Sequence, residues 1–184
     1  MSGAPASSPT EEQRAFRRAL GHFGTGVAIV TASTSGVPLG ATISSFNSVS
    51  LNPPLVLFSL VSQSLGIDQW RNASALCVSM LAEGQTETSN RFAKAGADKW
   101  ADTEIVAGSN GAPIIPGCIA YFECAPYAIY DGGDHDIFVC RVTRFWADER
   151  QAVPLLFYAG QYRQLAPVDG YVAPPLENMW LHGW

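Results

Sequence analysis

Apolar and β-branched residues gather in short runs bounded by turn residues, a pattern typical of β-strands rather than long helices. With so few helical stretches between the runs, a doubly wound parallel sheet is excluded. We therefore predict a mainly β protein, a largely antiparallel barrel with Greek-key crossings and a few short peripheral helices. The predicted strands are residues 27–33, 37–46, 49–51, 55–61, 75–81, 121–130 and 137–146, followed by a tight hairpin over 155–165.

Three short helices are expected around the strands. Thr10 followed by Gln13 is a capping-box pattern, and it marks the start of the first helix. Apolar residues then recur at helical spacing, at Phe16, Leu20 and Phe23. The other two helices are expected over residues 64–73 and 84–95.

Length and composition fit one folded domain. The chain has 184 residues, 47% hydrophobic and only 15% charged, and this low charge suggests that a second subunit covers part of the surface. A net charge of −5 argues against nucleic acid or an anionic membrane as the main partner, and no apolar run is long enough to span a bilayer. We expect a disordered leader over 1–9, the domain over 10–165 and an extended arm with two tryptophans over 166–184.

The cysteines give no sign of a metal site. Four are present, no two form a Cys-x-x-Cys pair, and the three histidines are not spaced for zinc. Buried reduced thiols in a cytoplasmic protein are the expectation.

One polar turn lies between the two longest predicted strands. Its sequence is Asp131-Gly132-Gly133-Asp134-His135-Asp136, and Asp and Gly are typical of hairpin turns. The pattern places the His135 imidazole at a hairpin tip, where it can face a ligand. The alternative is an ordinary turn that happens to contain a histidine.

Small residues and hydroxyls mark residues 38–50 as a candidate binding surface. Gly40 and Ala41 would let a flat body approach the backbone closely, and Thr42, Ser44 and Ser45 could bond the polar edge of a heterocycle. The alternative is an edge strand whose hydroxyls face water.

A second polar cluster runs from Ser59 to Ser64, at the start of the second predicted helix. Ser62 and Ser64 could hold a phosphate there, although capping their own helix is the commoner use of such serines. Arg91, on the third predicted helix, could add a bidentate clamp or simply be solvated.

Taken together and in order, several motifs resemble the flavin reductase family, the short-chain reductase components of two-component flavin monooxygenases. The resemblance covers residues 12–165, nearly all of the predicted domain. It is carried by Phe16–Gly21 with Phe23–Val27, by Ser44–Leu57, by Arg91–Ala93 and by Gly133–His135.

The resemblance implies a split β-barrel of the FMN-binding type, a homodimer, FMN or FAD as flavin, and NADH or NADPH as hydride donor. The flavin ring is then expected against Pro38, Leu39, Gly40, Ala41, Thr42, Ser44 and Ser45. Its phosphate side is expected near Ser59, Leu60, Val61, Ser64, Arg91 and Phe92. The nicotinamide is expected near His135 and bordered by Phe157, Tyr158, Ala159 and Gly160.

The implied activity is NAD(P)H-dependent flavin reduction, supplying reduced flavin to a separate monooxygenase, with His135 as the residue that orients the nicotinamide. Hydride transfer needs no strong acid or base, so backbone groups, hydroxyls and one imidazole suffice. The sequence departs from the family at Leu65, where many relatives carry Arg. Two alternatives stay open: a flavoprotein that retains its flavin and oxidises or reduces an organic substrate, and a flavin-binding module without turnover.

Overall fold

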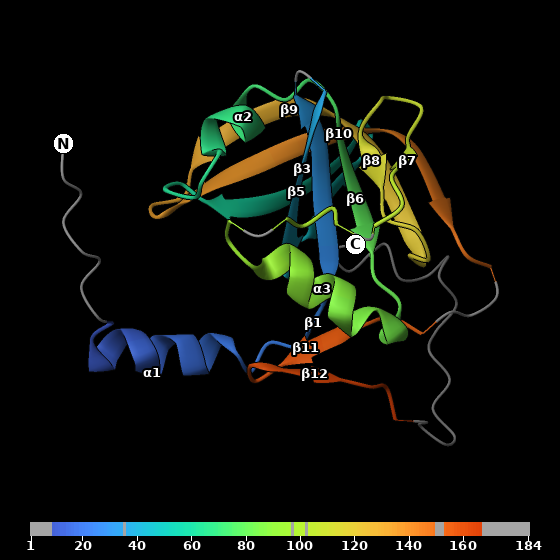
Figure 1. Ribbon diagram of the computed structural model, residues 1–184. Helices are drawn as coiled ribbons and strands as arrows, with labels where there is room; N and C mark the ends of the chain where they lie inside the picture. Colours follow the sequence, from blue (N-terminus) through green and yellow to red (C-terminus); the bar gives the residue numbers. More distant parts are fainter. Residues whose placement is uncertain (1–8, 35, 97, 102, 150–152, 167–184) are drawn as a thin grey trace.

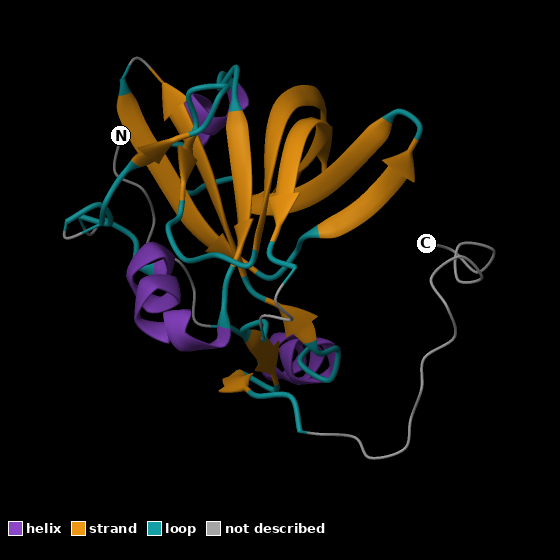
Figure 2. Cartoon of the chain, turned by 90° about the vertical axis from the view of Figure 1, so that its right-hand side faces the viewer, coloured by secondary structure: helices purple, strands orange, loops and turns teal. Residues whose placement is uncertain are grey.

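A seven-stranded antiparallel sheet forms the body of the molecule (Figures 1 and 2). The computed structural model describes residues 9–34, 36–96, 98–101, 103–149 and 153–166. The strand order is β3-β2-β6-β9-β10-β5-β4, so neighbours in the sheet are often distant in sequence, as in a Greek-key barrel. The strands are β2 (Ala28–Thr34), β3 (Val37–Ile43), β4 (Asn47–Leu51), β5 (Pro54–Val61), β6 (Leu76–Met80), β9 (Ala120–Asp131) and β10 (His135–Ala147).

The sheet curls around an apolar core, to which every other residue of several strands contributes. Phe58 of β5 and Phe138 of β10 are register partners, and their rings stack with centroids 5.2 Å apart. Both are buried, together with Val30 of β2 and Val78 of β6. The mainly β fold predicted from the sequence is confirmed, and it is the split-barrel type.

Two small sheets and the helices lie outside this body. Figures 1 and 2 both place the sheet of β1, β11 and β12 below the barrel, beside α1. The small-sheet strands are β1 (Thr25–Gly26), β11 (Leu156–Tyr158), β12 (Gln161–Arg163), β7 (Val106–Ala107) and β8 (Pro113–Ile114). The helices are α1 (Glu11–Leu20), α2 (Ile67–Arg71), the 3-10 turn η1 (Glu83–Gln85) and α3 (Thr86–Ala93).

Most of the predicted elements are found, with shifted ends. The capping box of α1 is present, because Thr10 Oγ1 accepts from Gln13 N and Gln13 Oε1 accepts from Thr10 N. The strand expected over 37–46 ends earlier, at Ile43, and the helix expected over 64–73 has only five residues. The two-residue strands β1, β7 and β8 were not predicted, since so short a segment has no periodicity to detect.

The expected leader and arm lie largely outside the described residues. Of the leader only Pro9 is described, and of the arm only Ala166. The two tryptophans of the arm are therefore not placed. No helix in the described part of the chain is long and apolar enough to cross a membrane. All four cysteines are free and buried, as expected.

Candidate functional site

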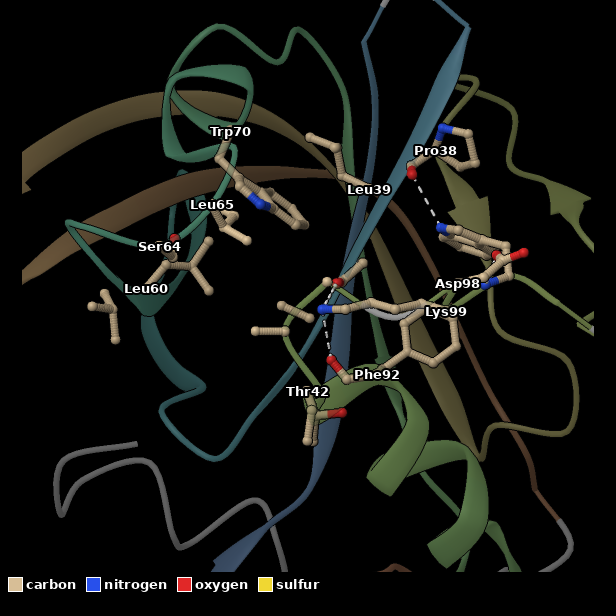
Figure 3. Close-up of a pocket in the computed structure, with 17 residues that line it drawn as sticks. Pro38, Leu39, Thr42, Leu60, Ser64, Leu65, Trp70, Phe92, Asp98 and Lys99 are labelled. Atoms are coloured by element: carbon tan, nitrogen blue, oxygen red, sulfur yellow. Dashed lines mark hydrogen bonds between the residues drawn. The ribbon is translucent and has the colours of Figure 1, made fainter. Parts of the chain in front are cut away.

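A large cavity lies between one edge of the barrel and α3. It has a volume of about 530 Å³ and is walled by β3, the end of β5, the segment up to α2 and the loop after α3 (Figure 3). That volume is in the range of cavities that hold cofactor-sized ligands. The residues predicted from the sequence that line it are Pro38, Leu39, Gly40, Ala41, Thr42, Leu60, Val61, Ser64 and Phe92.

Gly40 is required by packing within the chain. A Cβ built at Gly40 would lie 2.4 Å from Cε1 and 2.5 Å from Cδ1 of Phe92. The flat body that requires a glycine there is therefore the ring of Phe92, which is fully buried and packs edge-on against Trp100. Gly40 also lines the cavity, so the approach of a flavin to its backbone stays a prediction.

Side chains from α3 and the following loop cover the outer edge of β3. Trp100 Nε1 donates to the Pro38 carbonyl at 3.0 Å, and Lys99 Nζ donates to the Gly40 carbonyl at 2.9 Å. Thr42 Oγ1 donates to the Ser89 carbonyl at 2.6 Å. Because β3 is an edge strand, these bonds satisfy groups that no neighbouring strand can pair. No motif in the sequence singles out Lys99 and Trp100.

Ser44 and Ser45 lie in a second cavity. It has a volume of about 480 Å³ and is also lined by residues 23–26 and Asn47. Ser45 Oγ donates to the Ser59 carbonyl at 3.2 Å and accepts from the Ser59 amide at 3.0 Å. Ser59 and Ser45 thus bond each other, while Ser44 is exposed. The residues predicted to hold one flavin ring are therefore divided between two cavities of this chain.

His135 lies beside the first cavity, at the start of β10. Its register partner across the sheet is Val61, a cavity residue, and directly opposed residues share a face of the sheet. The ring is partly exposed, and Nδ1 lies 2.6 Å from Asp134 Oδ1. That hydrogen bond lowers the pKa of Asp134. The tip itself is Gly132 to Asp134, with Gly133 in the left-handed region at φ 82°.

The next residue, Asp136, fixes this hairpin to the segment that lines the cavity. Arg71 Nε donates to Asp136 Oδ2 at 2.7 Å, and Ser62 Oγ donates to Asp136 Oδ1 at 2.8 Å. The Ser62 amide also donates to the Asp134 carbonyl. The hydrogen bond from Arg71 is the main cause of the lowered pKa of Asp136. This network holds His135 in a fixed place relative to Val61.

The predicted anion site lies at the start of a short helix. The helix is α2, it has five residues, and its N-cap is Gly66, with no side-chain capping bond. Ser62 is bound to Asp136, so neither Ser62 nor Ser64 caps the helix. The Ser64 hydroxyl makes no hydrogen bond within the described residues and lines the cavity.

Arg91 does not line the first cavity, although its neighbour Phe92 does. Its Nε is buried and has no hydrogen-bond partner among the described residues. An orphaned donor of this kind is costly, which favours a bound acceptor.

Phe157, Tyr158 and Gly160 belong to the β11–β12 hairpin and do not line the first cavity. Its turn is Ala159 and Gly160, both at positive φ, and Tyr158 Oη lies 3.3 Å from His22 Nδ1. Within one chain, Phe157 packs against the apolar cluster that contains the cavity residue Phe92, but it does not itself line the cavity.

The donor set of the first cavity fits a flavin nucleotide. Apolar walls from Leu60, Leu65 and Trp70 suit an aromatic ring, and the Ser64 hydroxyl and the Lys99 ammonium suit an anion. Among the described residues no group of three or more His, Cys, Asp or Glu is placed to hold a metal ion.

Comparisons with known proteins agree with this geometry. Residues 20–166 match the flavin reductase like domain family. The reductase subunit of a flavin-dependent monooxygenase of Rhodococcus jostii is 38% identical over 94% of this chain and 87% of its own. An NADH-dependent FMN reductase of Agrobacterium fabrum is 41% identical over 83% of this chain and 86% of its own.

Solved structures give the same result. A nitrilotriacetate monooxygenase component B homologue from Mycobacterium thermoresistibile superposes with a TM-score of 0.84 at 38% identity, covering 89% of this chain and 92% of that one. An NADH:FAD oxidoreductase of Streptomyces globisporus, solved in complex with NAD and FAD fragments, gives 0.81 at 36% identity, covering 90% of this chain and all of that one (100%). This chain therefore belongs to the flavin reductase family.

Proposed function

We propose that this protein transfers a hydride from NADH or NADPH to FMN or FAD and supplies the reduced flavin to a separate monooxygenase. The observation that carries the proposal is the apolar cavity at the edge of the barrel, with His135 fixed beside it. Family membership supports it, because relatives are named as reductase components of two-component monooxygenases.

The chain's own residues bind and orient the two nucleotides, and they exclude water. The two nucleotides supply the redox chemistry, a hydride equivalent that passes between them when both are bound. The buried side chains of Leu60 and Trp70 form an apolar wall that keeps water from one face of the site. We assign His135 to orienting the nicotinamide, since it borders the cavity without lining it and can contact the outer of two stacked ligands.

We further propose that the working form is a homodimer. In α1 no residue is buried, and Phe16 and Leu20 are 64% and 57% exposed. Phe23, just beyond the helix, is 79% exposed. Figure 1 shows α1 standing away from the barrel, so its apolar side lacks a partner within the described chain. Covering such a surface with a second copy of the chain would remove it from water.

A dimer would also explain the dispersed predicted residues. Ser44, Ser45, Phe157 and Tyr158 do not join the first cavity of their own chain, and a second copy could bring them to it. Light scattering at micromolar concentration is expected to give about twice the chain mass of 19.7 kDa. A clean monomer that still reduces flavin would refute the homodimer. The four free, buried cysteines support a reducing, cytoplasmic setting.

The activity is tested by following NADH and NADPH consumption with FMN, with FAD and without added flavin. Dependence on added flavin supports a reductase that releases its product. Consumption by a yellow protein without added flavin would instead indicate a retained flavin, and binding without consumption would indicate a module without turnover.

A further inference from the structure

Lys99 brings the only basic side chain to the lining of the 530 Å³ cavity, as far as the described residues go. It lies in the loop after α3, outside every motif that predicted the site. Figure 3 shows its side chain crossing the cavity wall, with the ammonium near the centre of the lining residues. This charge can stabilise the fold, bind a ligand, or do both.

Part of its role is structural. Lys99 Nζ donates to the carbonyls of Gly40 and Phe92, both at 2.9 Å. Phe92 is in the last turn of α3, where cations are favourable, and Gly40 is on the open edge of β3. Because an ammonium has three N–H donors, one remains after these two bonds.

The Lys99 ammonium makes no ion pair within the described chain, although Asp98 lines the same cavity. The nearest acid in sequence, Asp98, accepts from the amides of Trp100 and Ala101. Lys99 is half-buried, and its burial lowers the pKa of the ammonium, as expected for a charge held without a counter-ion.

The other candidates for an anion are weaker. Leu65 lines the cavity with an apolar side chain, so no cation comes from that position. Arg91 does not line the cavity. Ser64 offers a hydroxyl without a partner in the described residues, but no charge.

On the basis of the proposed flavin-reductase function, we propose that Lys99 is the cation that binds the phosphate of the flavin nucleotide in this cavity. Lys99 thereby determines specificity for phosphorylated flavins over riboflavin. The same chemistry would also suit a phosphate of NADH, so the test must separate the two nucleotides.

Binding of oxidised riboflavin, FMN, FAD and NADH is measured by titration, each without the second substrate, so that no turnover occurs. Lys99→Met is expected to weaken FMN binding on the order of tenfold to a hundredfold and to leave riboflavin binding nearly unchanged. Lys99→Arg should retain most of the FMN affinity. Arg91→Ala, which alters a cation outside the lining, should lose less than Lys99→Met. Added salt should reproduce part of the Lys99→Met loss in the wild type.

Thermal unfolding of each variant identifies a purely structural effect. If Lys99→Met unfolds, Lys99→Gln replaces it, because an amide can still donate to the two carbonyls but carries no charge. An equal loss of riboflavin and FMN would show that Lys99 only supports the cavity wall. Unchanged FMN binding, or a loss confined to NADH, would also overturn the assignment. A wild type that binds no flavin at all would refute the proposed function instead.

Discussion

Gly40→Ala is the sharpest test of how the cavity wall is built. The new Cβ would lie 2.4 Å from Phe92 Cε1, and ordinary contacts begin near 3.4 Å. Phe92 would have to move by about 1 Å. It cannot do so freely, because its ring is fully buried and packs on Trp100 with centroids 4.9 Å apart.

Overpacking of this kind costs about 1–3 kcal/mol of unfolding free energy. For a chain of this size that corresponds to a fall in melting temperature on the order of 5 °C. Flavin affinity should fall as well, because Gly40 and Phe92 both line the cavity and hold the Lys99 ammonium.

The control is Gly84→Ala, since a Cβ at Gly84 meets nothing within 4 Å. Its stability should change by less than about 0.5 kcal/mol. Phe92→Leu in the Gly40→Ala background should recover part of the loss, as expected when one substitution relieves the other. Equal melting temperatures for Gly40→Ala and Gly84→Ala would refute the packing argument.

Two further changes test the hairpin. His135→Ala should lower nicotinamide affinity or the rate of hydride transfer on the order of tenfold to a hundredfold while flavin affinity stays nearly unchanged, measured by stopped-flow reduction and flavin titration. If flavin affinity alone fell, the role of His135 would be wrong. The folded pKa of Asp136 is lowered below its ordinary value of 3.8, so its contribution to stability is present above about pH 4 and is lost as the pH falls through the folded pKa. Asp136→Asn should therefore have a lower melting temperature than the wild type at neutral pH. Between about pH 5 and about pH 3 its melting temperature should fall by less than that of the wild type. An equal fall for the two proteins over that range would contradict this.

The sequence predicted the barrel because its strands are long enough to show a pattern. In β5, β9 and β10 apolar residues alternate or cluster over eight or more positions. The turn between β9 and β10 is recognisable because it consists of Asp and Gly. The cavity residues on β3 were found because small residues there are unusual in a strand.

Other features depend on contacts that no local pattern encodes. The reason for Gly40 is Phe92, fifty-two positions away, and the contact exists only because α3 packs on the edge of β3. Lys99 was not predicted, because the two carbonyls to which its side chain donates are brought together only in the folded chain. Arg91 does lie on a helix, as predicted, but the helical pattern does not show whether its side chain faces the cavity. Ser44 was grouped with the cavity residues because it lies among small residues and hydroxyls, and Phe157 was grouped with them through the resemblance. In a single chain neither residue lines the first cavity.

The most direct test of the proposed activity is the rate of NADH consumption by the purified protein as free FMN or FAD is added. We predict a colourless or weakly coloured protein whose NADH consumption is near zero without flavin and rises to saturation with flavin concentration. A protein that binds flavin and NADH but consumes no NADH at any flavin concentration would contradict the proposed function.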